Sequence, residues 1–244
     1  MLSRFTRRVR YSGGKVLRQR DEMRSFTLRG LTLSLPEAAL KGNLERALSS
    51  GRYEHHEADA LLLHLRPGDR LLDLGAGLGF ICALAARVLG EASVFGVEAG
   101  PETIRLARRN LVANGFRGVK LVRGAAVAEG EGEVEFGQRP AFWASALRGP
   151  EGWPENAEVI GVPSRPIGKL LARFAPTVIS CDIEGGEIAV LAEPLPGVRL
   201  VVVETHPHVY GPEGVERIVA GLIGQGFISE QAGAMADTLV FRRD

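Results

Sequence analysis

Residues 71–80 read Leu-Leu-Asp-Leu-Gly-Ala-Gly-Leu-Gly-Phe, and this stretch decides the fold. An apolar run passes at once into glycines on every second position and then into apolar residues at helical spacing. The pattern predicts a strand, a tight loop and a helix. Because glycine tolerates positive φ and carries no Cβ atom, a flat ligand can approach the backbone of such a loop. The stretch therefore predicts a ligand site at the carboxyl end of a strand.

The spacing of these glycines distinguishes two kinds of ligand. A dinucleotide-binding loop has its third glycine five residues after the first, but here Phe80 holds that position and Gly79 comes one residue early. Asp73 stands just before the loop, where it could accept hydrogen bonds from loop amides or face a cationic ligand. An ordinary strand–helix turn would also be rich in glycine. The later parts of the chain are therefore needed to distinguish a ligand-binding loop from such a turn.

Composition indicates a soluble globular protein. The 244 residues are 45% hydrophobic and 24% charged, with a net charge of +1, which gives no general attraction to nucleic acid. The chain has no apolar run long enough for a membrane span, and its arginine-rich start lacks the apolar core of a signal peptide, so we expect a cytoplasmic protein. The two cysteines, Cys82 and Cys181, suggest neither a disulfide framework nor a metal site.

We expect two regions, an N-terminal extension over 1–50 and a main domain over 51–244. The first 24 residues are rich in arginine and are expected to form a solvated tail, although an arm that meets an acidic partner or a second subunit stays open. Alternating apolar residues over Phe26–Leu35 predict a hairpin, and leucines at helical spacing after Pro36 predict a helix.

Strands and helices alternate beyond the glycine loop. The expected strands are Ser93–Glu98, Lys120–Val127, Val134–Phe136, Thr177–Ile183, Arg199–Val203, Phe227–Gln231 and Thr238–Arg242. This alternation predicts a parallel sheet covered by helices on both faces, with ligand sites at the carboxyl ends of the strands. Residues 137–158, which include Trp143 and Trp153, break the rhythm and form either a binding loop or a surface loop.

A carboxylate ends the expected strand Ser93–Glu98, which is the next strand after the one that precedes the glycine loop. Glu98 follows the glycines by about 20 residues, the separation at which an acid accepts hydrogen bonds from the hydroxyls of a ribose. Several nucleoside cofactors share this feature. Glu98 therefore predicts nucleoside binding without choosing the nucleoside.

The Asp-x-Gly-x-Gly-x-Gly pattern at 73–79 resembles motif I of the class I S-adenosylmethionine (SAM)-dependent methyltransferases. Two later stretches, VPSRPIGKLLARFAPTVISCDIEGGEIAVL at 162–191 and VVVETHP at 201–207, are similar to the FkbM family of methyltransferases. GRYEHHE at 51–57 and LVRGAAVAEGEGEVEF at 121–136 fall in that family's order. Two positions depart from its pattern, because Ser180-Cys181 replaces a lysine and Gly168 replaces an aspartate.

This resemblance implies a Rossmann-like class I methyltransferase fold, with a seven-stranded, mostly parallel sheet and a C-terminal antiparallel hairpin. It implies SAM as the cofactor and O-methylation of a hydroxyl on a sugar, a polyketide or another small metabolite. The implied cofactor site comprises Tyr53, Glu54, Asp73, Gly75, Ala76, Gly77, Gly79, Glu98, Ala99, Gly124, Ala125 and Asp182.

Four ionisable residues at the ends of the fourth and fifth core strands are candidates for catalysis: Asp182, Glu184, Glu204 and His206. Methyl transfer to a hydroxyl requires the acceptor oxygen to be aligned and its proton to be removed. His206 titrates near neutrality by residue type, and Asp182 lies closest to the first strand, so either could receive that proton. The same residues would suit Mg²⁺, but we expect metal-free catalysis.

Three other functions stay open. A NAD-dependent oxidoreductase is disfavoured by Phe80 and by the closing hairpin. A SAM-binding protein without catalysis would use the acids as structural groups. Nucleic-acid methylation has support only in the basic N-terminal arm. We therefore expect a small-molecule or sugar hydroxyl as acceptor and neither a membrane nor a nucleic acid as partner, while a homodimer is left open.

Overall fold

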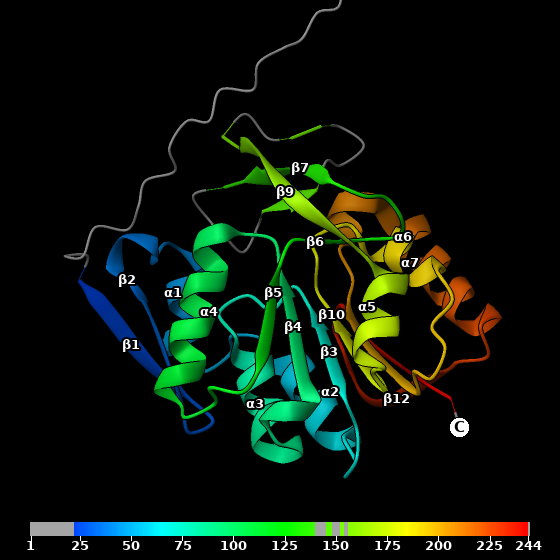
Figure 1. The fold of residues 1–244 in the computed structure, drawn as a ribbon, viewed down its shortest axis with the longest axis horizontal. Coiled ribbons are helices and arrows are strands. Elements are labelled where there is room, and N and C mark those ends of the chain that lie inside the picture. Colours follow the sequence, from blue (N-terminus) through cyan, green and yellow to red (C-terminus); the bar gives the residue numbers. More distant parts are fainter. Residues whose placement is uncertain (1–21, 140–144, 148–151, 154–155, 244) are drawn as a thin grey trace, which may run out of the picture.

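The computed structural model describes residues 22–139, 145–147, 152–153 and 156–243. A seven-stranded sheet forms its centre (Figure 1). The strands are β3 (Leu71–Leu74), β4 (Val94–Glu98), β5 (Lys120–Arg123), β10 (Val178–Cys181), β11 (Leu200–Glu204), β12 (Ile228–Met235) and β13 (Thr238–Arg242). Their order is β12-β13-β11-β10-β3-β4-β5. Pairing is parallel from β11 to β5, and β13 is antiparallel to both of its neighbours, which confirms the predicted fold.

Helices cover both faces of this sheet. One face carries α2 (His55–His64), α3 (Phe80–Leu89) and α4 (Pro101–Ala113), and the other carries α5 (Ile167–Phe174), α6 (Glu187–Ala192) and α7 (Pro207–Gly224). Successive side chains of a strand point to opposite faces, so an apolar strand such as β11 is buried on both sides. No helix in the described part of the chain is both long and apolar enough to cross a bilayer.

The predicted N-terminal hairpin is present as β1 (Met23–Leu28) and β2 (Leu31–Pro36). Its apolar side chains, including Leu33 and Leu35, share one core with α3 and with α1 (Asn43–Ser49). Asn110 of α4 accepts a hydrogen bond from the Ser34 amide at 2.9 Å and donates one to the Leu78 carbonyl at 3.0 Å. The hairpin is therefore held by both polar and apolar contacts to the helices beside the glycine loop.

The helix expected after Pro36 is interrupted. A short 3-10 helix at Glu37–Ala39 is followed by α1, and Gly42 between them has φ 54° and ψ −114°. These angles are incompatible with a continuous α-helix. The first 21 residues of the basic arm lie outside the described residues.

A second sheet lies beyond the end of β5 (Figure 1). Its strands, in the order β6-β9-β7-β8, are β6 (Ala125–Val127), β7 (Glu133–Gln138), β8 (Ala146–Leu147) and β9 (Glu158–Pro166). The single strand expected over 120–127 is divided at Gly124, whose φ is 144°, so β5 joins the large sheet and β6 the small one. The expected edge strand at Val134–Phe136 belongs to this small sheet as part of β7. Within the irregular segment, Trp153 packs against Gly137, and Phe142 and Trp143 lie outside the described residues.

Candidate active site

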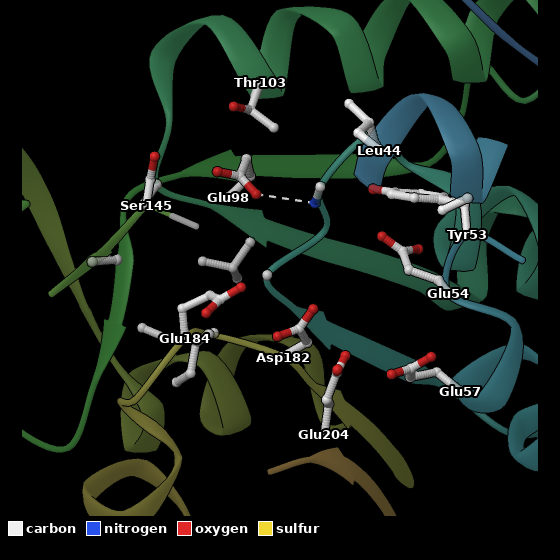
Figure 2. A pocket seen from close by; sticks show the side chains of 18 of the residues that line it. Leu44, Tyr53, Glu54, Glu57, Glu98, Thr103, Ser145, Asp182, Glu184 and Glu204 are labelled. Atoms are coloured by element: carbon white, nitrogen blue, oxygen red, sulfur yellow. Dashed lines mark hydrogen bonds between the residues drawn. The ribbon is translucent and has the colours of Figure 1, made fainter. Parts of the chain in front are cut away.

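A pocket of about 370 Å³ opens at the carboxyl ends of the central strands (Figure 2). The glycine loop after β3, the ends of β4, β10 and β11, the start of α2 and the small sheet form its wall. The predicted site residues in this wall are Tyr53, Glu54, Gly75, Gly77, Glu98, Ala99, Gly124, Ala125, Asp182, Glu184 and Glu204. Four others, Asp73, Ala76, Gly79 and His206, lie outside the described wall.

The glycine loop is held between two strands, which explains its sequence. The amides of Gly75 and Ala76 both donate to the carbonyl oxygen of Val97, at 2.9 and 3.0 Å. Gly75 has φ 88°, and a Cβ atom there would overlap the carbonyl oxygen of Asp182. At Gly77, with φ 50°, a Cβ atom would lie 2.9 Å from the hydroxyl oxygen of Tyr53. The backbone overlap requires glycine at position 75, whereas a side chain at position 77 would have to displace the side chains of Tyr53 and Glu54.

Glu98 reaches the pocket from the end of β4. Its carboxylate accepts hydrogen bonds from the amides of Gly77 at 3.0 Å, as Figure 2 shows, and of Gly100 at 2.7 Å. Burial raises the pKa of Glu98 to about 7, although these amides oppose the shift. A carboxylate has about four lone-pair positions, so two amide bonds leave acceptor capacity for ribose hydroxyls. Glu98 thus lines the pocket with acceptor capacity to spare, and its binding of a ribose stays a prediction.

Asp73, in β3 just before the glycine loop, contacts α3. It is 3% exposed, and its carboxylate accepts a hydrogen bond from the thiol of Cys82 at 3.1 Å. Burial raises the pKa of Asp73 to about 7. Cys82 and Cys181 are both buried free thiols. Gly79 likewise has a packing role, because the backbone of Ala107 in α4 leaves little room for a side chain there.

The segment after β10 orients the carboxylates of Asp182 and Glu184. Glu187, which is fully buried, accepts hydrogen bonds from the amides of Ile183 at 3.0 Å and Gly185 at 2.9 Å. These bonds close residues 182–187 into a tight loop, in which Glu184 adopts a left-handed φ of 53°. Glu187 was not predicted as a site residue. The one sequence signal for it is its place in the stretch 162–191 that is similar to the FkbM family.

His206 lies behind these carboxylates and contacts three acids. Its Nδ1 atom is 3.1 Å from Glu187, and its Nε2 atom is 3.4 Å from Asp182 and 3.6 Å from Glu184. Burial lowers the pKa of the imidazole, but the hydrogen bond to Glu187 and the three negative charges outweigh it and raise the pKa to about 9. The ring is therefore already protonated at neutral pH. This geometry does not agree with the expectation that His206 takes the acceptor's proton.

Six carboxylates from the described part of the chain line the pocket. Figure 2 shows Glu54, Glu57, Glu98, Asp182, Glu184 and Glu204 around one space. Burial raises the pKa values of Glu54, Asp182 and Glu184. Burial, the charge of Asp182 and a hydrogen bond with Glu57 raise the pKa of Glu204 to about 11. Glu57 was not predicted as a site residue, because the first turn of a helix is usually exposed.

One corner of the pocket offers a set of metal-ligand atoms. Oxygen or nitrogen atoms of Asp182, Glu184 and His206 lie within 4.8 Å of one another. Carboxylate oxygens are the ligands that Mg²⁺ prefers, so these residues could hold a divalent cation. His206 Nε2 lies near both acids, but the buried Oδ1 atom of Asp182 has no hydrogen-bond partner among the described residues.

The similarity to a known protein family covers the part of the chain around the glycine loop. A family model described as a methyltransferase domain matches residues 65–130, the stretch that contains the loop and Glu98. The chain has a class I methyltransferase fold. The matched stretch contains Glu98 but none of the other five described acids that line the pocket.

Relatives with curated names match only part of the chain. Protein-L-isoaspartate O-methyltransferase 1 of Archaeoglobus fulgidus is 41% identical over 64 residues, 26% of this chain and 30% of that protein. Ribosomal protein L11 methyltransferase of Chloroflexus aurantiacus is 35% identical over 101 residues, 39% of this chain and 28% of that protein. The chain therefore spans less than a third of the length of either relative. A solved structure of methyltransferase FkbM from Methylobacillus flagellatus aligns with a TM-score of 0.47 and 17% identity, over 84% of this chain and 53% of that chain.

Proposed function

We propose that the protein is a SAM-dependent methyltransferase that methylates a hydroxyl on a sugar, a polyketide or another small metabolite. One observation carries the proposal: Gly75, Gly77 and Glu98 line the same pocket as Asp182 and Glu184. A nucleoside site and a set of acid–base groups are thus side by side. The methyltransferase-domain match supports the choice of cofactor, and the FkbM resemblance of residues 162–207 supports the choice of acceptor.

The residues of the pocket fit SAM. Gly75 and Gly77 line the pocket, and the adjacent Glu98 can accept hydrogen bonds from ribose hydroxyls. The many carboxylates suit a ligand that carries a sulfonium and an ammonium group. When bound, SAM would supply a methyl group activated by its positively charged sulfur. NAD fits less well, because Phe80 replaces the third glycine of a dinucleotide loop and β13 is antiparallel.

We assign Asp182 as the general base. Its carboxylate faces the pocket beside the glycine loop, and burial raises its pKa, which makes it a stronger base than an exposed aspartate. A cation bound nearby would favour its ionised form. His206 and Glu187 are positioning residues, since Glu187 orients the imidazolium that contacts Asp182. The scheme uses no metal ion.

Calorimetry tests the cofactor. We expect micromolar binding of SAM and no binding of NAD. Glu98→Ala is expected to weaken SAM binding by about tenfold or more, because it removes charge-assisted hydrogen bonds. Glu216→Ala, a change at an exposed acid of α7, is the matched control and is expected to bind normally. Binding of NAD in place of SAM would disprove the cofactor assignment.

Transfer of labelled methyl groups to a panel of hydroxylated sugars and polyketides tests the chemistry. Asp182→Asn is expected to keep SAM affinity and lose transfer, and exhaustive chelation is expected to leave the wild-type rate unchanged. Normal transfer by Asp182→Asn would rule out its role as base. Loss of activity on chelation with recovery in Mg²⁺ would replace the metal-free scheme by a metal-assisted one at the same corner of the pocket. SAM binding without transfer to any member of the panel would favour a non-catalytic role.

A further inference from the structure

A second hollow follows the outer edge of β5. Two cavities of about 470 and 400 Å³ adjoin there, since Val122 and Arg173 line both. We call the two together the β5 groove. Its wall includes cationic side chains from α4, the turn before β5, β5 itself, β9 and α5: Arg108, Arg117, Lys120, Arg165, Lys169 and Arg173. The positive charge therefore comes from segments far apart in the chain.

Little negative charge balances these side chains. Among the described residues that line the groove, Glu131 is the one acid, and it pairs with Lys169 at 2.5 Å. Lys120 and Arg173 are held by ring contacts, over Phe95 at 5.6 Å and Phe174 at 5.2 Å. Their charges thus remain available to a ligand.

The edge of β5 is blocked to another strand. β5 ends the large sheet, and an open edge usually offers its main-chain groups to an added peptide strand. Here Arg108 donates to the carbonyl of Leu121 at 3.3 Å, and Arg165 donates to the carbonyl of Arg123 at 2.8 Å. An acidic peptide that paired with β5 would have to displace both. Each guanidinium has five N–H donors, so both retain donors for an anion that lies on top of them.

We propose that the β5 groove binds the phosphodiester backbone of a single-stranded nucleic acid. Arginine is suited to phosphate because its planar donors match the phosphate oxygens, and four of the six cations are arginines. Residues of both α4 and α5 line the 470 Å³ part of the groove, and a single strand is the smaller of the two kinds of nucleic acid that could lie there. The expectation of no nucleic-acid partner came from the net charge of +1, which averages an acidic pocket with a basic groove.

The groove ends beside the active-site pocket. A Cβ atom at Gly124 would lie 2.7 Å from the Cγ atom of Arg165, so these residues are in contact. Gly124 lines the pocket and Arg165 lines the groove. A strand in the groove would thus pass close to the pocket mouth. The proposal concerns binding alone and does not depend on the methylation proposed above.

Fluorescence anisotropy of a labelled oligouridylate of about 12 nucleotides tests the proposal with the full chain. The triple variant Arg117→Gln, Lys120→Gln, Arg173→Gln is expected to bind at least about tenfold more weakly. The slope of log K against log salt is expected to flatten by about 2, at roughly 0.7 for each phosphate that the variant no longer neutralises. Arg217→Gln, at an exposed arginine of α7, is the matched control and is expected to bind like the wild type.

Further measurements separate the outcomes. Far-UV circular dichroism and thermal unfolding are measured in parallel and are expected to be normal in the triple variant, which would show that it folds. If it does not fold, Arg117→Gln with Lys169→Gln, both at exposed positions, takes its place. Equal binding of oligouridylate and oligothymidylate would support the phosphate backbone as the ligand. Undiminished binding by the folded variant, or equally tight binding of polyglutamate, would overturn the proposal.

Discussion

At residue 75 the backbone passes so close to the carbonyl oxygen of Asp182 that no Cβ atom fits. Its φ is 88°, and Gly68, in the turn before β3, has a φ of 90°. Nothing lies within 4 Å of the place where a Cβ atom would stand at Gly68. The two glycines therefore share a left-handed φ and differ in their surroundings. Comparing them separates the strain of a left-handed backbone from the effect of steric overlap.

We expect Gly75→Ala to destabilise the protein more than Gly68→Ala. The left-handed conformation alone should lower the free energy of unfolding by about 1–2 kcal/mol at Gly68. Overlap with Asp182 should add about 1–3 kcal/mol at Gly75 and weaken SAM binding, because the loop or the strand end must shift. Urea unfolding and calorimetry on both variants provide the measurement. Equal losses of stability with normal SAM binding would contradict this account of the loop.

At the scale of elements, the β1–β2 hairpin joins the expected extension to the main domain. Leu33 is 0% exposed and lies in the same core as α3, whereas Thr27 on the other face of the hairpin is exposed. A hairpin that shares its core with the sheet should not unfold separately from it. The division at residue 50 would then separate segments of the sequence without separating folding units.

The variant Leu33→Ala tests whether the hairpin unfolds together with the sheet. We expect it to lower the free energy of unfolding by about 2–5 kcal/mol through the cavity it leaves. Far-UV and near-UV circular dichroism should report one common transition. Thr27→Ala is the control and should change stability by no more than about 0.5 kcal/mol. An early transition that leaves the sheet intact would instead indicate that 1–50 is a separate unit.

Across the whole molecule, charge is segregated although the net charge is only +1. Six acids surround the pocket, and cations line the β5 groove. Glu98 illustrates the effect, because burial raises its pKa to about 7. It holds its proton more tightly in the folded protein than at its ordinary pKa of 4.5. Its contribution to stability is therefore present at low pH and is lost as the pH rises from about 4.5 to about 7.

Binding of a cationic cofactor should depend on pH in the opposite sense. We expect the affinity for SAM to rise from about pH 6 to about pH 8, because protons compete with the cation for Glu98 and its neighbours. S-adenosylhomocysteine, which lacks the sulfonium charge, should show a weaker dependence. Calorimetry in two buffers of different ionisation enthalpy measures the protons released. A Glu98→Gln variant should release fewer, and equal pH dependence for the two ligands would argue against a charge effect.

The sequence by itself determined the fold class, the glycine loop and the place of Glu98. Each of these depends on signals within a short stretch: the spacing of glycines at 75, 77 and 79, apolar strands of four or five residues, and an acid directly after a strand. The parallel pairing of the central strands followed from the alternation of strands and helices, because few topologies allow it.

Only the tertiary structure decided which groups meet at the carboxyl ends of the strands. It brought Glu57 into the pocket, turned Asp73 toward Cys82, and surrounded His206 with three acids that raise its pKa to about 9. It also assembled the β5 groove from segments distant in sequence. The physical reason is that burial and charge act over a few ångströms of space. A residue's type indicates its chemistry, but its protonation and its partners depend on which other segments fold against it.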